Sequence, residues 1–485
     1  MKDRILQGIQ DHPLAVPILE QGVQRGEPIY LVGGALRDMA LGVTPKDLDF
    51  VTEHPFEMAR HFAERYGSKV VPLGKEATST YRIPLEGFCL DWVGLTGGSI
   101  EADLRRRDFT INAIAFDPEL REFLDPAGGF ADLQASRLRM TSPAAFQDDP
   151  VRMVKAFRML ALFPDFWLDP LTEAAILDEQ EALLDVPADR IHAELERLFL
   201  ASRPGAAVRK MADLGLLFLL VPEMAPLKGL AQNHYHHADV LVHSLEALEN
   251  CDGDLPWLAS LELPRPFNPQ EVLILRLAAL FHDLGKADTR TEDVRGTHFY
   301  GHPKPSADKA LSILKRLRFS NAVAEAVSDL CLNHLRPLAL LHNASRLTAL
   351  RRLVHSMGDR LSLLLALAYA DKAAARGDGR ERTLAELAAL SREVMALART
   401  EGSQLTRLPK LVDGLRAMEI LGLVKPGPEL GQALDALMEL QVEGKITEAA
   451  AAEEYLAEWA QRHLGPRAPT PSKLPRTAHR AITGE

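Results

Sequence analysis

Two aspartates, Asp47 and Asp49, are the residues in this sequence best suited to phosphoryl chemistry. They lie in a β-prone run that predicts a strand, in which side chains two positions apart point to the same face. Two carboxylates on one face repel each other unless a cation lies between them, and a two-metal phosphoryl-transfer site needs that arrangement. The alternative is an edge strand whose acidic residues only keep the sheet soluble.

A pair of glycines, Gly33 and Gly34, precedes these aspartates, between a strand-like segment (IYLVG) and a helix-like segment (ALRDMAL). Glycine lets the backbone approach a phosphate closely, and the first turn of a helix offers free N–H groups and a partial positive charge. Asp91 lies in another strand-like run, LDWVG, and is our candidate for a third carboxylate that takes the proton from an attacking hydroxyl. The pattern predicts a nucleotide site with Asp47, Asp49 and Asp91 as its catalytic residues.

A second cluster could complete such a site. The run Arg105-Arg106-Arg107 comes shortly before Asp108 and Asn112. Guanidinium groups can reach triphosphate oxygens while the two other side chains bond a ribose hydroxyl. On its own, a run of arginines usually forms a solvated face.

A third cluster, Asp149 and Arg152, lies in the segment DDPVRMVKAFRM. In a helix these residues are i,i+3 neighbours and can form a fixed pair. Such a pair presents one acceptor and a planar fork of donors, which can read the Watson–Crick edge of a base without a template. The alternative is an ordinary salt bridge at a helix start.

Histidines are concentrated between residues 230 and 375, where the pair His282-Asp283 ends an apolar, helix-like segment. Neutral imidazoles and carboxylates are ligands for divalent metals. A lone buried histidine is more often a satisfied core residue, but an adjacent His-Asp pair with further histidines and aspartates around it is hard to explain by packing. The candidate ligands are His243, His282, Asp283 and Asp371, with His302 and His334 as further ones.

The elements that must position these residues divide the chain into a mixed head and a helical remainder. β-prone segments alternate with helical patterns in the head, and almost everything after residue 145 has helical periodicity. We therefore predict a multidomain fold, with a small α/β head followed by an all-α neck, body and tail. The predicted ranges are 1–28 for an N-terminal helix and entry segment, 29–140 for the head, 141–229 for the neck, 230–375 for the histidine-rich body, 376–465 for the tail and 466–485 for a disordered, proline-rich end.

Charge and cysteine content limit the class of protein. The net charge of −11 argues against a chain coated in positive charge, but it leaves room for a local basic strip that contacts phosphates. The three cysteines are far apart and lack CxxC spacing, which excludes a zinc ribbon or a disulfide scaffold. We see no secretory signal and no apolar run long enough to span a bilayer. A cytoplasmic protein without a membrane partner is expected.

In combination, these segments resemble the class II tRNA nucleotidyltransferase and bacterial poly(A) polymerase family. The resemblance runs in order over residues 30–200. GGALRDMALGVTPKDLDF is similar to the catalytic signature, RRDFTINAIAFD to the ribose-binding signature and DDPVRMVKAFRM to the base-selecting segment. LDPAGGFADLQASRLR and PADRIHAELERL resemble the head–neck hinge and the following neck signature. The resemblance implies a polymerase β-like head that adds nucleotides from CTP and ATP to the 3′ end of tRNA without a template.

The resemblance also implies a role for each residue of the predicted site. Asp47 and Asp49 would bind two Mg²⁺ ions, and Asp91 would help activate the primer hydroxyl. Asp148 departs from the glutamate that is usual at its position in the family. Asp149 and Arg152 would select the base. The residues that would bind the nucleotide are Gly33, Gly34, Arg37, Arg106, Arg107, Asp108, Asn112, Asp149 and Arg152.

One departure from the family pattern bears on the product. Members that add all three nucleotides usually carry a polar flexible loop between the third carboxylate and the RRD segment, and this loop is tied to the switch from C to A addition. Here Asp91 is followed only by WVGLTGGSIEA before Asp103. In this respect the sequence resembles the CC-adding subset, which stops before the terminal A.

The histidine-rich segment resembles the HD phosphohydrolase superfamily, which implies His243, His282, Asp283 and Asp371 as ligands of Mg²⁺ or of a divalent transition metal. Members with this fused arrangement hydrolyse phosphomonoesters or 2′,3′-cyclic phosphates, and a degenerate, structural HD fold is the alternative. Residues 408–447 resemble the tail that holds the tRNA elbow. Two other functions stay open: a poly(A) polymerase acting on RNA 3′ ends, and an HD phosphohydrolase whose head only binds nucleotide or RNA.

Overall fold

The computed structural model describes residues 1–74, 80–232, 239–294, 296–341, 346–375, 379–406 and 408–465. The predicted disordered end, 466–485, lies outside the described residues. The chain forms two compact units. The first comprises residues 1–255, 267–332 and a short stretch that begins at 373, and the second comprises 256–266, 333–372 and the described residues from 379 onward. The predicted histidine-rich body therefore contributes residues to both units.

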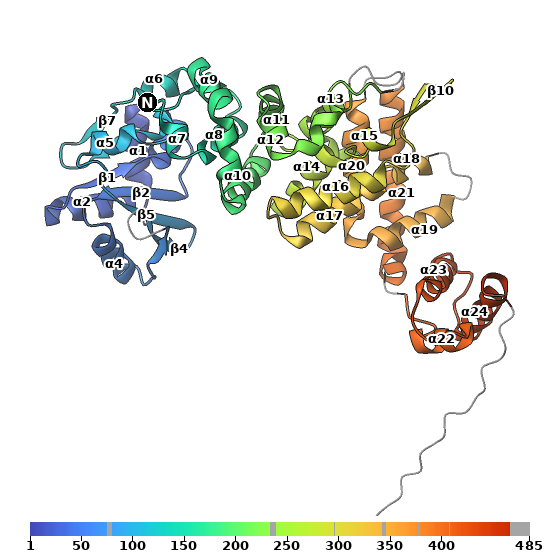
Figure 1. The fold of residues 1–485 in the computed structure, drawn as a ribbon. Helices are drawn as coiled ribbons and strands as arrows, with labels where there is room; N and C mark the ends of the chain where they lie inside the picture. Colours follow the sequence, from blue (N-terminus) through green and yellow to red (C-terminus); the bar gives the residue numbers. More distant parts are fainter. Residues whose placement is uncertain are drawn as a thin grey trace, which may run out of the picture. The chain divides into compact units, whose positions relative to one another are not determined.

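The head is built on a seven-stranded mixed sheet, drawn in blue in Figure 1, with the strand order β3-β4-β5-β2-β1-β6-β7. β2 and β5 run parallel with Asp49 opposite Asp91, while β4 runs antiparallel to β5 with Arg82 opposite Asp91. The predicted α/β head is confirmed, although β4 and β7 were not expected. The strands are β1 (Ile29–Val32), β2 (Asp47–Thr52), β3 (Val71–Leu73), β4 (Thr80–Leu85), β5 (Phe88–Gly94), β6 (Ala115–Asp117) and β7 (Glu122–Leu124).

Helices cover the head sheet. The N-terminal segment, residues 1–28, forms two helices where one was predicted: α1 (Lys2–Asp11) and α2 (Ala15–Arg25). His12 is extended between them, because the residue before a proline, here Pro13, is disfavoured in helical conformation. The other helices are α3 (Gly34–Ala40), α4 (Pro55–Arg65) and α5 (Ile100–Arg105).

Three fully buried aromatic rings form the centre of the head core. The rings of Phe50 on β2 and Phe62 on α4 both stack on Trp92 of β5, with centroid distances of 4.8 and 5.2 Å. Burial of such rings contributes on the order of 2–3 kcal/mol each. The core therefore fixes β2 against β5, the two strands that carry the candidate carboxylates.

The neck is helical, as predicted, apart from one short parallel pair of strands, β8 (Arg137–Leu138) and β9 (Trp167–Leu168). Its two longest helices, α8 and α10, pack against each other and are tied by an ion pair of 2.6 Å between Arg158 and Glu194. α6 (Gly129–Gln134) still belongs to the head range, and the neck helices are α7 (Ala145–Asp148), α8 (Val151–Leu162), α9 (Pro170–Glu179), α10 (Ala188–Leu200), α11 (Pro204–Asp213) and α12 (Leu216–Leu220).

The rest of the first unit begins the histidine-rich body. Arg276, on α14, is only 3% exposed, and it donates hydrogen bonds of 2.7–2.9 Å to the backbone carbonyls of Phe199, Ala201 and Cys251. These bonds fasten the end of α10 to α14. The elements are α13 (Val240–Glu249), α14 (Pro269–Phe281), α15 (Lys286–Thr289), β10 (Thr291–Asp293), β11 (Gly296–His298), α16 (Pro303–Arg316) and α17 (Asn321–Asn333).

The second unit is helical. Arg351 on α19 pairs with Glu401 on α21 at 2.8 Å, and a separate apolar core that includes Leu437, Leu456 and Trp459 holds the last three helices together. Residues 422–427 separate α22 from α23. The helices are α18 (Arg336–Leu340), α19 (Arg346–Met357), α20 (Leu361–Ala374), α21 (Arg380–Thr406), α22 (Gly414–Leu421), α23 (Pro428–Val442) and α24 (Ala449–His463).

Among the described helices, none combines the length and the apolarity needed to cross a membrane.

Candidate active site and histidine–aspartate cluster

A cavity of about 1120 Å³ opens between the head and the neck helices α8 and α10. Most of the predicted nucleotide-site residues meet there, although they come from segments far apart in the sequence. Arg106 does not line this cavity; it is exposed at the end of α5, while its neighbour Arg107 points inward. The predicted residues that line the cavity are Gly33, Gly34, Arg37, Asp47, Asp49, Asp91, Arg107, Asp108, Asn112, Asp149 and Arg152.

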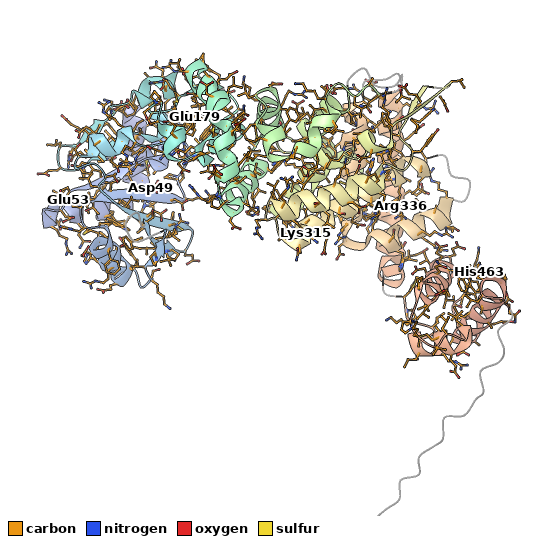
Figure 2. All side chains as sticks on the ribbon, viewed as in Figure 1. Asp49, Glu53, Glu179, Lys315, Arg336 and His463 are labelled. Carbon is orange, nitrogen blue, oxygen red and sulfur yellow. The ribbon has the colours of Figure 1, made fainter. Side chains whose placement is uncertain are left out.

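Asp47, Asp49 and Asp91 form what we call the carboxylate row. Asp47 and Asp49 stand two positions apart on β2, as predicted, and Asp91 is opposite Asp49 on the parallel strand β5. Figure 2 marks Asp49 on the head sheet. Desolvation, reinforced by the charges of Asp91 and Asp47, raises the pKa of Asp49 to about 6, although Arg107 opposes the shift. The row therefore concentrates negative charge that a divalent cation would stabilise.

Gly33 is required by both conformation and space. Its φ of +76° is in the region that L side chains rarely adopt. A Cβ atom there would stand 3.0 Å from an Arg107 Nη atom and 3.3 Å from Asp49 Oδ2. Any side chain would therefore displace a cation–carboxylate arrangement in the cavity wall.

Arg37 is held in a fixed orientation on α3. It donates to Asp38 at 2.6 and 2.8 Å and to Asn112 at 2.5 Å, and its guanidinium lies 5.1 Å from the ring centre of Phe163. The Arg37 side chain thus contacts both the head and the neck. It positions Asn112, and it also lines the cavity.

Asp108 accepts hydrogen bonds from the Asn112 amide at 3.0 Å and from the Phe109 backbone at 2.7 Å, and it pairs with Lys155 of α8. Burial alone would raise the pKa of Asp108. The Lys155 ammonium and these hydrogen bonds outweigh burial and hold the pKa well below its ordinary value. Asp108 is thus a fixed anion beside Asn112, which suits it to accept from a sugar hydroxyl.

Asp149 makes a different pair from the predicted one. Its carboxylate accepts from Arg190 of α10 at 2.8 Å, whereas the nearest ion-pair approach of Arg152 is 4.0 Å. The reason is local: Asp149 precedes Pro150 and is extended, so it is not part of α8 and the i,i+3 helical geometry does not apply. Asp149 Oδ1 is buried and has no hydrogen-bond partner among the described residues. That oxygen is an acceptor available to a ligand.

Three cavity residues that were not predicted form ion pairs with predicted carboxylates: Lys155, Arg190 and Arg82. Lys155 follows Arg152 at helical spacing, so it could have been found from the periodicity of α8. Arg190 lies in the neck segment but its partner is distant in sequence. Arg82 pairs with Asp91 through two hydrogen bonds of 2.8 and 2.6 Å, and no local signal marked it because β4 was not predicted.

The second predicted site is partly assembled in the first unit. His243, His282 and Asp283 offer ligand atoms that all lie within 4.8 Å of one another. His282 Nε2 and His302 Nε2 stand 3.2 Å from the two oxygens of Asp283, and His243 Nε2 is 3.7 Å away. We call these four buried residues the HD cluster. Asp371, on α20, and His334 belong to the second unit, and their predicted role as ligands stays a prediction.

The donor set of the HD cluster fits a divalent metal. His282 Nδ1 and His302 Nδ1 lie 2.9 and 2.8 Å from the carbonyl oxygens of Ala279 and Phe299. A proton on each Nδ1 leaves the Nε2 lone pair facing Asp283, which is the form that binds a metal. Burial alone would raise the pKa of Asp283, but the adjacent His282 and the Lys286 ammonium, 2.7 Å away, hold it well below its ordinary value.

Comparisons with protein families cover most of the chain. The poly A polymerase head domain matches residues 29–139, and the HD domain matches 241–390. A family described as the probable RNA and SrmB-binding site of polymerase A matches 165–228.

Curated relatives extend the similarity to nearly full length. An A-adding tRNA nucleotidyltransferase of Deinococcus radiodurans is 34% identical over 444 residues, which cover 90% of this chain and 96% of the relative. A CC-adding tRNA nucleotidyltransferase of Thermus thermophilus is 34% identical over 439 residues, covering 89% and 93%.

Solved structures share the fold. The Thermotoga maritima CCA-adding enzyme complexed with tRNA has a TM-score of 0.57 at 21% identity and covers 94% of this chain and 98% of its own. A CCA-adding enzyme with ATP has a TM-score of 0.61 at 19% identity, covering 94% and 97%.

Proposed function

Because the chain belongs to the tRNA nucleotidyltransferase and poly(A) polymerase family, we propose that it transfers nucleotides from CTP, and from ATP where the product requires it, to the 3′-hydroxyl of tRNA. The transfer releases pyrophosphate and uses no template. The observation that carries the proposal is the single cavity that joins the carboxylate row of the head to Asp149 and Arg152 of the neck. One wall suits phosphoryl transfer and the other suits recognition of a base.

Asp47 and Asp49 would hold two Mg²⁺ ions, because carboxylate oxygens are the ligands that this ion prefers and the row has an excess of negative charge. The ions would lower the pKa of the attacking hydroxyl and offset charge on the leaving pyrophosphate. Asp91 would orient that hydroxyl or accept its proton. Arg107 and Arg37 would contact the triphosphate beside Gly33, and Arg106 is not assigned there since it is exposed.

The sugar and base would be held by separate groups. Asp108 and Asn112 are positioned to bond a ribose hydroxyl, since Lys155 keeps Asp108 ionised. Asp149 Oδ1 offers an acceptor and Arg152 offers donors. Cytosine and adenine both present an amino donor next to a ring-nitrogen acceptor, so one such pair accommodates both bases, whereas uracil and guanine present the opposite pattern.

We further propose that the product ends in CC. In the structure β5 ends at Gly94 and α5 begins at Ile100, so only residues 95–99 connect the third carboxylate's strand to the arginine segment. This connection leaves no room for a long polar loop. The two curated relatives differ in the nucleotides that they add: one is A-adding and the other is CC-adding.

The deciding experiment presents purified enzyme with tRNAs ending before the CCA, after C and after CC, with labelled CTP and ATP supplied separately. A CC-adding enzyme extends the first two with CTP and leaves the third unchanged with ATP. Extension of the third by one A contradicts the CC proposal but not the family function. Long A tails on unrelated RNAs would establish the poly(A) polymerase alternative, and no incorporation into any RNA would overturn the proposed transfer.

A second activity, metal-dependent phosphohydrolysis, is favoured by the HD cluster. His243, His282, Asp283 and His302 would bind the metal, which would supply an activated water. The test combines metal analysis of the purified chain with hydrolysis of a phosphomonoester and of a 2′,3′-cyclic nucleotide. A chain that binds metal and hydrolyses neither has a structural HD fold. Hydrolysis without any nucleotide incorporation would support the alternative of a non-catalytic head.

The three cysteines fit a reducing compartment. None of Cys89, Cys251 and Cys331 forms a disulfide, and burial raises the pKa of Cys251 to about 12, which makes it unreactive. We therefore propose that the enzyme works in the cytoplasm, where tRNA substrates and reduced thiols coexist.

A further inference from the structure

Arg82 reaches the active cavity from β4, a strand outside the segments that resemble the family signatures. Its Nε and one Nη atom donate to the two oxygens of Asp91 at 2.8 and 2.6 Å. The pair is partly screened from water, since the side chain of Asp91 is 9% exposed and that of Arg82 is 34% exposed. A two-point contact of this kind fixes the plane of a carboxylate as well as its charge.

The contact follows from strand register. Arg82 is the direct cross-strand neighbour of Asp91, and Asp91 is in turn the neighbour of Asp49. The three side chains therefore form a line across β4, β5 and β2. The guanidinium stands at the outer end of the carboxylate row, where it offsets the repulsion between Asp91 and Asp49.

We propose that Arg82 is a positioning residue for nucleotide transfer: it holds Asp91 in the orientation in which that carboxylate meets the attacking 3′-hydroxyl. The inference rests on the proposed function of the cavity. With both oxygens held from the β4 side, Asp91 cannot rotate about its side-chain bonds, and its remaining lone pairs face the cavity. Lysine can supply the positive charge of this contact but not its two-point geometry, because an ammonium group has no planar fork.

A different role would give a different kinetic signature. Arg82 lines the cavity, so a direct contact with a substrate phosphate is the competing interpretation. Loss of a phosphate contact raises KM for CTP or tRNA and adds to the effect of changing Asp91. Loss of a positioning contact lowers kcat, leaves KM nearly unchanged and has little further effect once Asp91 is gone.

The test compares wild type, Arg82→Ala, Arg82→Lys, Asp91→Asn, the Arg82→Ala/Asp91→Asn double variant and Arg60→Ala, which removes an exposed arginine on α4. We expect Arg82→Ala to lower kcat about 100-fold with KM values within about 3-fold, since misplacement of a reacting group by about 1 Å has that effect. Arg82→Lys should recover part of the rate. The double variant should be no slower than Asp91→Asn, and Arg60→Ala should match wild type.

Thermal unfolding supplies a readout that does not depend on activity. Arg82→Ala leaves Asp91, 6% exposed, without its cation, so its melting temperature should fall, and Asp91→Asn in the same chain should restore part of the loss. The inference is overturned by an unchanged or higher kcat in Arg82→Ala, by a KM effect with normal kcat, or by additive losses in the double variant. A wild-type chain that incorporates nothing would instead overturn the proposed function.

Discussion

The carboxylate row and the HD cluster are both suited to bind a cation, but they differ in ligand type and in exposure. The row has only oxygen ligands, and it forms one wall of a cavity of about 1120 Å³ that is also lined by arginines and two lysines. The HD cluster surrounds one carboxylate, Asp283, with imidazoles, and all four side chains are at most 8% exposed. An open wall of oxygens suits Mg²⁺ that arrives with a nucleotide, whereas a closed set of nitrogens suits a metal that stays bound.

The difference also lies in where the compensating charge comes from. In the HD cluster, the surrounding rings and Lys286 hold the pKa of Asp283 down, so the site is stable as a folded structure. In the row, desolvation and neighbouring carboxylates raise the pKa of Asp49, so the site is strained until a cation is present. A cation that binds only transiently therefore explains the carboxylate row better than it explains the HD cluster.

The largest expected effect is the loss of nucleotide incorporation when a carboxylate of the row is removed. Asp47→Ala or Asp49→Ala should lower nucleotide incorporation by at least about 1000-fold, equivalent to about 4 kcal/mol of transition-state stabilisation. Neither change should reduce the free energy of unfolding, because each removes a repulsive carboxylate. Labelled-CTP incorporation and urea unfolding check this, with Asp359→Ala, an exposed site of the second unit, as the control. Substantial incorporation in either variant contradicts the assignment of the row.

The reverse experiment concerns the metal of the HD cluster. Asp283→Asn should weaken metal binding about 100-fold or more, as loss of a ligand exceeds the effect of losing its outer-shell support. Nucleotide incorporation should remain at the wild-type level. Metal content measured by mass spectrometry, together with incorporation assays, decides the matter, and Asp308→Asn on the exposed face of α16 serves as control. Equal metal content in the two variants would show that the cluster is not a metal site.

The next effect, on stability, concerns Asp108, whose pKa is lowered, in contrast to that of Asp49, which is raised. Lys155→Met leaves Asp108 buried without its cation, which should lower the free energy of unfolding by about 3 kcal/mol at pH 7. The folded pKa of Asp108 is depressed, so its contribution to stability is present above the ordinary pKa near 3.8 and is lost as the pH falls. The difference between variant and wild type should therefore shrink as the pH falls below about 4. A difference independent of pH would mean that Lys155 acts through packing.

The smallest effect is a pH dependence of stability. Two carboxylates, Asp49 and Asp252, have pKa values raised to about 6, chiefly by burial. A raised folded pKa means that the folded state binds more protons, so stability should fall as the pH rises from about 4 to 6, by about 1–2 kcal/mol per group. Asp252→Asn should remove the contribution of Asp252 to this pH dependence, and Mg²⁺ should remove only the contribution of Asp49. Urea unfolding across this range measures both, and a slope unaffected by Mg²⁺ would contradict a cation site at Asp49.

The sequence predicted the polymerase-like head and the helical remainder, and most of the nucleotide-site residues it singled out line the cavity. Those residues lie in continuous segments whose spacing carries the information. Glycines before a helix, alternating aspartates on a strand and the His-Asp pair at the end of α14 are local patterns, and each appears in its expected element.

What could not be predicted depends on pairing between distant segments. Arg82 meets Asp91 only through the register of β4, a strand in which Pro84 and a charged residue weaken the β pattern. Asp149 bonds Arg190 because a proline removes it from the helix that spacing alone would have extended. Arg106 illustrates the converse: its segment was identified, but the end of α5 turns that side chain to solvent while Arg107 faces inward.

The bonds of Arg276 have a practical consequence for anyone who wishes to separate the two sites by truncation. Deleting α14 would expose three carbonyl acceptors at the end of α10 and of α13, and α10 also supplies Arg190 to the nucleotide cavity. A fragment that stops at residue 229 would therefore be expected to aggregate or fray. An expression fragment carrying the transferase alone should retain α14, and silencing of the other site is better done by point substitution.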